Sequence, residues 1–167
     1  MSSTEENLKK AFSGESQASR RYKAFAEKAE REGYPQVAKL FRAASEAETI
    51  HATNDLLIMK GVKSTADNLK AAIEGETYEY TDMYPSFLKD AKKDGQKAAE
   101  KIFQEAKETE EYHAAYYTEA LEKVKQKKDI PPKDYYVCTV CGYTAENEAP
   151  DECPICGSTK KSFRRVD

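Results

Sequence analysis

The chain has 167 residues, 34% of them charged, and a formal net charge of -3. This length suits one well-buried domain with a small accessory module and is too short for two full-sized cores. Basic and acidic residues are interspersed, so no positive block is available for a phosphate backbone, and nucleic acid is not an expected partner. No apolar run approaches the roughly 20 residues of a membrane span. We therefore expect no membrane anchor, no signal peptide and a cytoplasmic location.

The sequence predicts a mainly α four-helix bundle over residues 1–128. Apolar side chains recur at helical spacing from residue 4 to about residue 127, and three turn-like segments divide this region into four helices of roughly 25 to 30 residues. These segments are residues 32–35, 60–65 and 93–96. Pro35 suits a first helical turn, Ser64 or Thr65 suits a cap of the third helix, and Pro85 should bend that helix.

The bundle region contains an internal repeat. Glu15 matches Glu76 at an offset of 61 residues, whereas Tyr22 matches Tyr84 at an offset of 62. One residue is therefore inserted between Glu76 and Tyr84. A helix commonly absorbs such an insertion as a π-bulge, often at a functional site, and Glu79 lies in this window.

Each predicted helix carries a glutamate in its apolar stripe, where a carboxylate is least expected. These are Glu15, Glu48, Glu76 and Glu110. The inward stripe of the second helix, for example, runs Val37, Phe41, Ala44, Glu48, His51 and Ile58. Because a buried carboxylate without a partner is costly, four of them need positive charge nearby. The two histidines of the chain cannot neutralise them all, whereas a pair of metal ions can. Glutamate oxygens and imidazole nitrogens are ligands that iron or manganese accept.

Both histidines follow a glutamate by three residues, as Glu48–His51 and Glu110–His113. This spacing places the two side chains on one helical face about 5 Å apart. A lone Glu-x-x-His pair most often belongs to a solvated helix face. Here the pair occurs twice on inward stripes together with two further inward glutamates, which favours a dinuclear metal site.

The C-terminal segment predicts a second metal site. After a linker at residues 129–134, residues 135–167 are too few to build an apolar core without a metal or another crosslink. They contain all four cysteines, in two Cys-x-x-Cys pairs: Cys138, Cys141, Cys153 and Cys156. Four such thiolates suit tetrahedral zinc or iron, and the spacing alone leaves both open, with structural zinc the commoner case for an isolated ribbon.

Taken together, these motifs resemble the rubrerythrin family over essentially the whole chain. They are "GES" at residue 14, "EAETIHA" at 46, "EGETYEYTDMYP" at 74, "ETEEYHA" at 108, and "YVCTVCGY" with "CPICG", which resemble rubredoxin. The resemblance implies a ferritin-like di-iron bundle with a small C-terminal rubredoxin-like domain that binds one iron. It also implies a peroxidase that reduces hydrogen peroxide to water, receives electrons through the iron of the four cysteines and serves in oxidative stress defence.

The same resemblance implies a role for each candidate ligand. Glu15 would be terminal on one iron, Glu76 and His113 would bind the other, and Glu48 and Glu110 would bridge them. Glu79 and His51 would be alternative ligands of the first iron that exchange with its oxidation state. Tyr22 and Tyr84 match family tyrosines near the cluster, where they either fill the core or hydrogen-bond to ligands.

The implied partners are an electron donor, such as rubredoxin or an NAD(P)H-dependent reductase, and a second copy of the chain. About 8 to 10 residues separate the second and third helices, a reach of at most roughly 30 Å, whereas the second helix is nearly 40 Å long. Either the bundle is up-down-up-down, or helix pairs are exchanged in a homodimer, which we favour. Two other functions stay open: a ferroxidase or iron-storage protein, and a structural protein with zinc at both sites.

Overall fold

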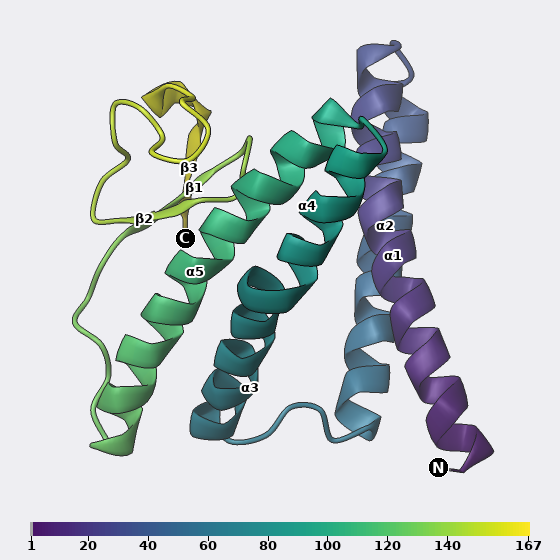
Figure 1. The fold of residues 1–167 in the computed structure, drawn as a ribbon. Coiled ribbons are helices and arrows are strands. Elements are labelled where there is room, and N and C mark those ends of the chain that lie inside the picture. The colour runs from purple at the N-terminus through teal and green to yellow at the C-terminus, as the bar shows by residue number, and fades with distance from the viewer. Residues whose placement is uncertain (1) are drawn as a thin grey trace. The chain divides into compact units, whose positions relative to one another are not determined.

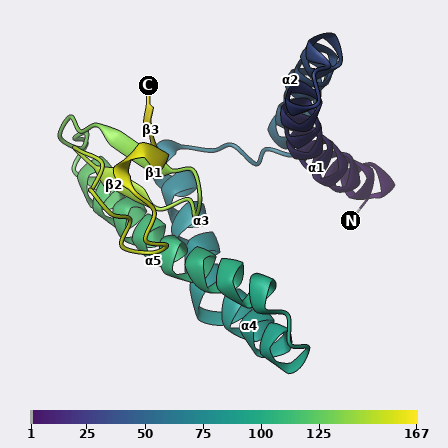
Figure 2. The ribbon, with the colours of Figure 1, turned by 90° about the horizontal axis from the view of Figure 1, so that it is seen from above.

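A computed structural model describes residues 2–167 (Figure 1). Met1, the first residue of the predicted bundle segment, lies outside the described residues. The chain forms two compact units, Met1–Lys63 and Ser64–Asp167. The first unit is a pair of helices, and the second contains the remaining helices and a small sheet (Figure 2). Among the described residues, no helix is long and apolar enough to cross a membrane.

The first unit consists of α1 (Ser3–Arg31) and α2 (Pro35–Ile58). Ser2 caps α1 reciprocally with Glu5: its hydroxyl accepts the Glu5 backbone N–H at 3.3 Å, and Glu5 Oε2 accepts the Ser2 N–H at 2.8 Å. Gly33, with a φ of 83°, makes the turn between the helices. Pro35 then opens α2, as the sequence predicted, because a first-turn residue needs no backbone N–H.

Small side chains bring α1 and α2 close together. The buried apolar residues of this unit are all alanines: Ala18, Ala26, Ala29, Ala38 and Ala52. Between the helices, the Ser45 hydroxyl donates to the Ser19 carbonyl at 2.9 Å, and the Ser19 and Thr49 hydroxyls lie 2.8 Å apart. Larger apolar residues expected to face inward stay partly exposed, with Val37 at 44% and Ile58 at 65%.

In the second unit, the predicted third helix consists of three consecutive pieces. In chain order they are α3 (Thr65–Tyr78), the π-helix η1 (Glu79–Met83) and α4 (Tyr84–Lys93), and α5 (Lys97–Lys125) follows them. Ser64 caps α3, as predicted, by accepting the Asp67 backbone N–H at 3.2 Å. The π-helix falls in the window where the repeat gains a residue, which confirms the predicted bulge. Pro85 follows it in the first turn of α4.

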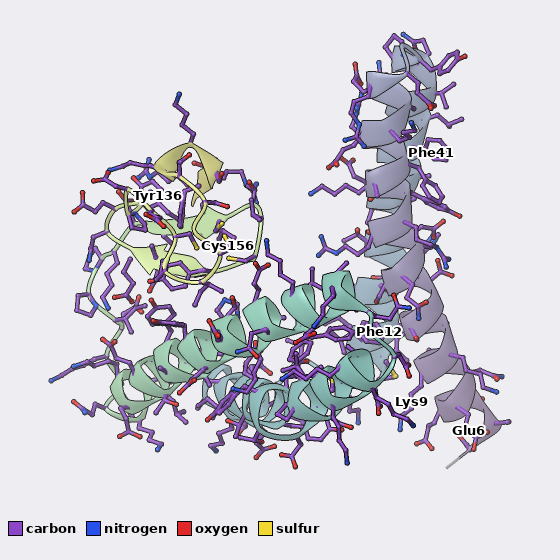
Figure 3. The ribbon with its side chains drawn as sticks, turned by 45° about the horizontal axis from the view of Figure 1, so that its top comes forward. Glu6, Lys9, Phe12, Phe41, Tyr136 and Cys156 are labelled. Atoms are coloured by element: carbon purple, nitrogen blue, oxygen red, sulfur yellow. The ribbon has the colours of Figure 1, made fainter. Side chains whose placement is uncertain are left out.

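The C-terminal module is a three-stranded antiparallel sheet with strand order β2-β1-β3. Its strands are β1 (Tyr135–Cys138), β2 (Thr144–Glu146) and β3 (Phe163–Val166). Cys138 and Cys153 are buried within it, with 1% and 2% exposure. Figure 3 places Tyr136 and Cys156 in this module, and Phe41 in the helix pair of the first unit.

Several polar and aromatic contacts join this module to α5 within the second unit. The Tyr116 hydroxyl donates to the Thr144 carbonyl at 3.0 Å, and the rings of Tyr112 and Tyr143 meet edge to face with centroids 4.9 Å apart. Lys133, in the segment before β1, lies 2.9 Å from Glu146 of β2 and 3.4 Å from Glu119 of α5. The cysteine-containing loops are therefore held beside the middle of α5.

Candidate metal centres

The first unit gathers three metal-ligating side chains between its two helices. Glu15 comes from α1, and Glu48 and His51 come from α2 one helical turn apart. One ligand atom from each lies within 4.8 Å of the others. His51 Nδ1 is 2.9 Å from Glu48 Oε2, and the His51 side chain is 61% exposed. Within residues 2–167, this glutamate is the hydrogen-bond partner of the His51 ring.

The second unit repeats this arrangement with deeper burial. Glu76 comes from α3, and Glu110 and His113 come from α5, again with ligand atoms within 4.8 Å of one another. His113 Nδ1 is 2.7 Å from Glu110 Oε2, and the two side chains are 25% and 16% exposed. The helix pairs thus carry equivalent sets of two carboxylates and one imidazole. We call these sets the first trio (Glu15, Glu48, His51) and the second trio (Glu76, Glu110, His113).

Matching aromatic clusters accompany the two trios. In the first unit the Tyr22 ring lies 6.2 Å from the rings of both Phe25 and Phe41. In the second unit the Tyr84 ring lies 6.1 Å from Phe87 and 6.2 Å from Phe103. The second cluster is the first shifted by 62 residues, so the internal repeat extends to the packing around the candidate ligands.

A hydrogen bond between two carboxyl groups is the main influence on the pKa values of the first trio. A shared hydrogen bond with Glu48 is the main cause that raises the pKa of Glu15 above its ordinary value. The same hydrogen bond lowers the pKa of Glu48, and the hydrogen bond with His51 lowers it further. Of these two carboxyl groups, Glu15 is therefore the one that binds a proton more readily.

In the second trio, too, one carboxyl group has a raised pKa and the other a lowered pKa. Burial, together with the hydrogen bond and negative charge of Glu110, raises the pKa of Glu76 to about 7. The hydrogen bond with His113 lowers the pKa of Glu110, and the reciprocal contact raises the pKa of His113. A metal cation would replace both the shared proton and the imidazolium charge, so this donor set fits iron or another oxygen- and nitrogen-binding metal.

Glu79 lies beside the second trio without belonging to it. It begins the π-helix one turn after Glu76. Burial is the main cause that raises its pKa, and the negative charge of Glu110 adds to the effect. Burial and the charges of Glu79, Glu110 and Glu76 also raise the pKa of Tyr84, so this phenol faces the same group of carboxylates.

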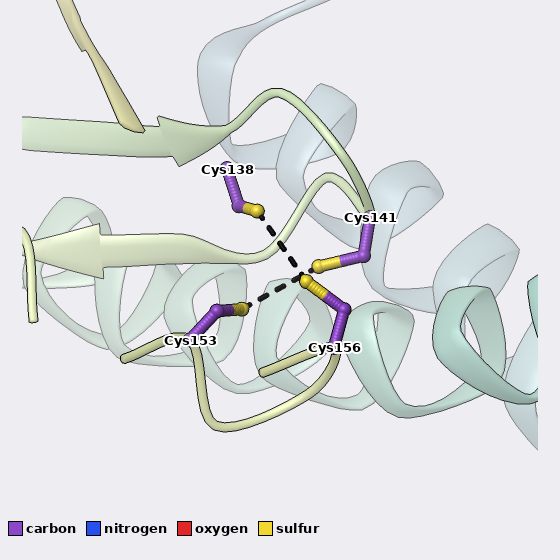
Figure 4. Close-up of side chains that lie close together, drawn as sticks. All are labelled: Cys138, Cys141, Cys153 and Cys156. Carbon is purple, nitrogen blue, oxygen red and sulfur yellow. Dashed lines mark hydrogen bonds between the residues drawn. The ribbon is translucent and has the colours of Figure 1, made fainter. Parts of the chain in front are cut away.

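The four cysteines form a compact group of sulfur atoms (Figure 4). Cys138 Sγ lies 3.7 Å from Cys156 Sγ, and Cys141 Sγ lies 3.6 Å from Cys153 Sγ. A tetrahedral metal with bonds of about 2.3 Å to sulfur needs sulfur–sulfur edges of about 3.8 Å, so the group fits one metal ion bound by four thiolates. Burial opposes thiolate formation, yet hydrogen bonds from the Ser158 hydroxyl and backbone N–H lower the pKa of Cys156 to about 7.

One contact near the second trio was missed from the sequence. His113 Nε2 lies 3.2 Å from the hydroxyl oxygen of Thr144, which opens β2. Thr109, one turn before His113 on α5, donates to the Cys141 carbonyl at 3.5 Å. No local pattern marks these residues, because the contact joins segments 31 residues apart.

Comparison with known proteins identifies the family. The rubrerythrin family model matches residues 6–121, and the model of the rubrerythrin rubredoxin-like domain matches residues 136–164. The chain belongs to the rubrerythrin family. The fold is accordingly a mainly α, ferritin-like four-helix domain followed by a small rubredoxin-like domain, as the sequence predicted.

Relatives of this rubrerythrin-family chain align over nearly its full length. It is 37% identical to rubrerythrin-2 of Clostridium acetobutylicum, with 96% of this chain and 95% of the relative covered. It is 35% identical to nigerythrin of Nitratidesulfovibrio vulgaris, covering 96% and 85%. A solved structure of nigerythrin in its fully reduced, all-ferrous state matches with a TM-score of 0.58 at 34% identity, covering 99% of this chain and 88% of that one.

The pKa shifts of the second trio predict how metal-free protein responds to pH. Glu76 and His113 both bind a proton more tightly in the folded than in the unfolded state. The melting temperature of metal-free protein should therefore fall as pH rises from about 5 to about 7. The lowered pKa of Glu110 changes the stability only at lower pH, where this carboxylate becomes protonated. Scanning calorimetry across this range tests the expectation.

A matched pair of variants identifies the group responsible. Glu76→Gln should flatten the dependence in this pH range, because it removes the carboxyl whose pKa is about 7. Glu74→Gln, on the exposed side of the same helix, should show the same slope of melting temperature against pH as wild type. A Glu76→Gln protein with the wild-type slope would show that this carboxyl does not set the pH response.

Proposed function

We propose that this chain is a peroxidase that reduces hydrogen peroxide to water at a carboxylate-bridged di-iron centre. The observation that carries the proposal is the presence of two equivalent Glu, Glu, His trios and a four-cysteine site in one rubrerythrin-family chain. Iron storage or ferroxidase activity needs no electron carrier of this kind, which favours the peroxidase. The all-ferrous state of nigerythrin supports iron as the metal.

In this proposal the trios divide the ligands of two irons. Glu15 would bind one iron, Glu76 and His113 would bind the other, and Glu48 and Glu110 would be shared between them. His51 and Glu79 would be alternative ligands of the first iron. The high exposure of the His51 side chain, 61% against 25% for His113, supports a ligand that can leave. Tyr22 and Tyr84 would lie beside these ligands, and the ring of each packs near two phenylalanine rings.

The glutamates and histidines of the two trios would hold the metal ions at a fixed separation and balance their charge. With iron bound there, the centre would supply the two electrons that, with two protons, reduce one hydrogen peroxide to two waters. The four-cysteine site, filled with iron, would return electrons from a rubredoxin or an NAD(P)H-dependent reductase. The function fits oxidative stress defence.

We further propose that the centre is completed in a homodimer by exchange of helix pairs. Residues 59–64 join α2 to α3 and span at most about 25 Å, whereas the 24 residues of α2 extend about 36 Å. The link is therefore too short to cross along α2, as a ferritin-like connection must. Each unit also leaves an equivalent aromatic ring accessible, Phe25 at 46% and Phe87 at 40%, and a partner's helices would cover them.

The visible spectrum tests the peroxidase directly. Protein isolated with iron should be red from the four-cysteine site, should bleach with a reductant and should regain its colour when peroxide is added. Peroxide consumption driven by NADH through an added reductase should accompany the cycle. A colourless protein with zinc at both sites, or colour that peroxide fails to restore, would refute the proposal.

Variants of the first trio separate a bridging ligand from an exchangeable one. Glu48→Ala should lose most of the bundle iron, because it removes a bridge between the two ions. His51→Ala should keep that iron and turn over about tenfold more slowly. Glu46→Ala, an exposed carboxylate on the same helix, is the control and should match wild type. Iron per chain and peroxide consumption are the measurements, and equal iron loss in both trio variants contradicts the assignment.

Mixing two defective chains tests the exchange of helix pairs. One variant carries Glu15→Ala with Glu48→Ala, the other Glu76→Ala with Glu110→Ala, and each alone should bind no bundle iron. In an exchanged dimer, a mixed pair purified through two different tags combines both intact trios in one centre, so half the bundle iron of wild type should return. In a dimer without exchange every centre keeps one damaged trio. A mixed dimer without bundle iron would exclude the exchange.

A further inference from the structure

We propose that Thr144 of the rubredoxin-like module is a positioning residue for His113. Its hydroxyl oxygen accepts a hydrogen bond from His113 Nε2–H. This contact fixes the ring with Nδ1 toward the carboxylates of the second trio. The contact also ties the orientation of a candidate iron ligand to the docking of the rubredoxin-like module. Its consequence for turnover rests on the function proposed above, whereas the hydrogen bond itself does not.

The His113 ring is held between two partners on opposite sides. Nδ1 lies 2.7 Å from Glu110 Oε2, and Nε2 lies 3.2 Å from Thr144 Oγ1. A metal bound among the trio would take Nδ1, the nitrogen on the carboxylate side, which leaves the proton on Nε2.

The surroundings of Thr144 give its hydroxyl the role of acceptor toward His113. The same hydroxyl lies 3.5 Å from the Gly142 carbonyl, which can only accept. The threonine proton is therefore directed to Gly142, and its oxygen lone pairs are available to His113 Nε2–H. The two hydrogen bonds form a chain from His113 through Thr144 to Gly142, the residue that follows Cys141.

Docking of the module does not depend on this hydroxyl. The Thr144 carbonyl, not its side chain, accepts from Tyr116 at 3.0 Å, and Lys133 bridges the module to Glu119 of α5. The Tyr112–Tyr143 ring contact adds apolar area. Removing the hydroxyl alone should therefore leave the module in place and release only the histidine ring.

Within the first unit, the described residues give the His51 ring no second restraint of this kind, which makes the two histidines unequal. Within the described residues, the His51 ring has Glu48 as its hydrogen-bond partner, and its side chain is 61% exposed. His113 has partners at both nitrogens and is 25% exposed. Thr144 thus supplies a physical reason for one histidine to stay in place while the other is free to exchange.

Histidine NMR tests the hydrogen bond without requiring activity. We would label histidine with ¹⁵N in a His51→Gln background, so that His113 gives the only imidazole signals, and record protein with and without zinc. Wild-type Thr144 and Thr144→Ser should show a slowly exchanging Nε2–H. Thr144→Val, which keeps the shape and removes the hydroxyl, should lose it or speed its exchange at least about tenfold. Thr139→Val, whose hydroxyl donates to the Ser162 carbonyl within the module, is the control.

Stopped-flow mixing of reduced, iron-loaded protein with peroxide supplies the second measurement. Oxidation of the bundle iron, and with it the return of the red colour, should slow about tenfold in Thr144→Val, because His113 is no longer held in one orientation, and Thr144→Ser should restore both rates. Absence of peroxide oxidation in wild type would count against the peroxidase alone, since the NMR result stands separately. If Thr144→Val matches wild type in Nε2–H exchange, the positioning role of Thr144 is wrong.

Discussion

Crowding of like-charged carboxylates is the constraint on which this protein depends. Each helix pair brings two glutamates into hydrogen-bond contact, and neither pair can hold two full negative charges without a cation or a proton between them. The opposite pKa shifts of Glu76 and Glu110 express this conflict in the metal-free chain. A metal ion bound by both carboxylates would remove this repulsion. The glutamates that replace apolar residues at mid-length therefore suit these helices to metal binding.

Two departures from the repeat act on the second half alone. The π-helix inserts a residue between Glu76 and Tyr84 and brings Glu79 beside the second trio. The rubredoxin-like module adds contacts along α5, including the one to His113. Within the described residues of the first unit, no π-helix interrupts α1 or α2, and the His51 side chain is 61% exposed. A pair of equivalent sites has thus become unequal through local geometry, while the ligand types remain identical.

Most of the candidate site could be predicted because its candidate ligands follow short sequence spacings. Glu-x-x-His is a helical spacing, Cys-x-x-Cys is a tight turn, and a one-residue change of repeat offset marks a π-helix. Burial was harder to predict. Val37 and Ile58 lie on the expected inward stripes, yet they are 44% and 65% exposed, because a helical stripe gives a direction without naming the partner that covers it. The Thr144 contact lay beyond prediction, since it depends on how a separate module settles on α5.

The loop after Cys141 both surrounds the sulfur site and contacts α5. Gly142 has a φ of 88°, so only glycine turns the chain there without strain, and a side chain at this position would contact Thr109 of α5 at 3.9 Å. The next residue, Tyr143, packs on Tyr112, and its backbone N–H hydrogen-bonds to the Cys141 thiol, which lowers the pKa of that thiol against the larger effect of burial. Thr144 then reaches His113. The segment that shapes one side of the sulfur site is therefore also the surface that meets the helix, so a change that loosens docking must also disturb the surroundings of Cys141.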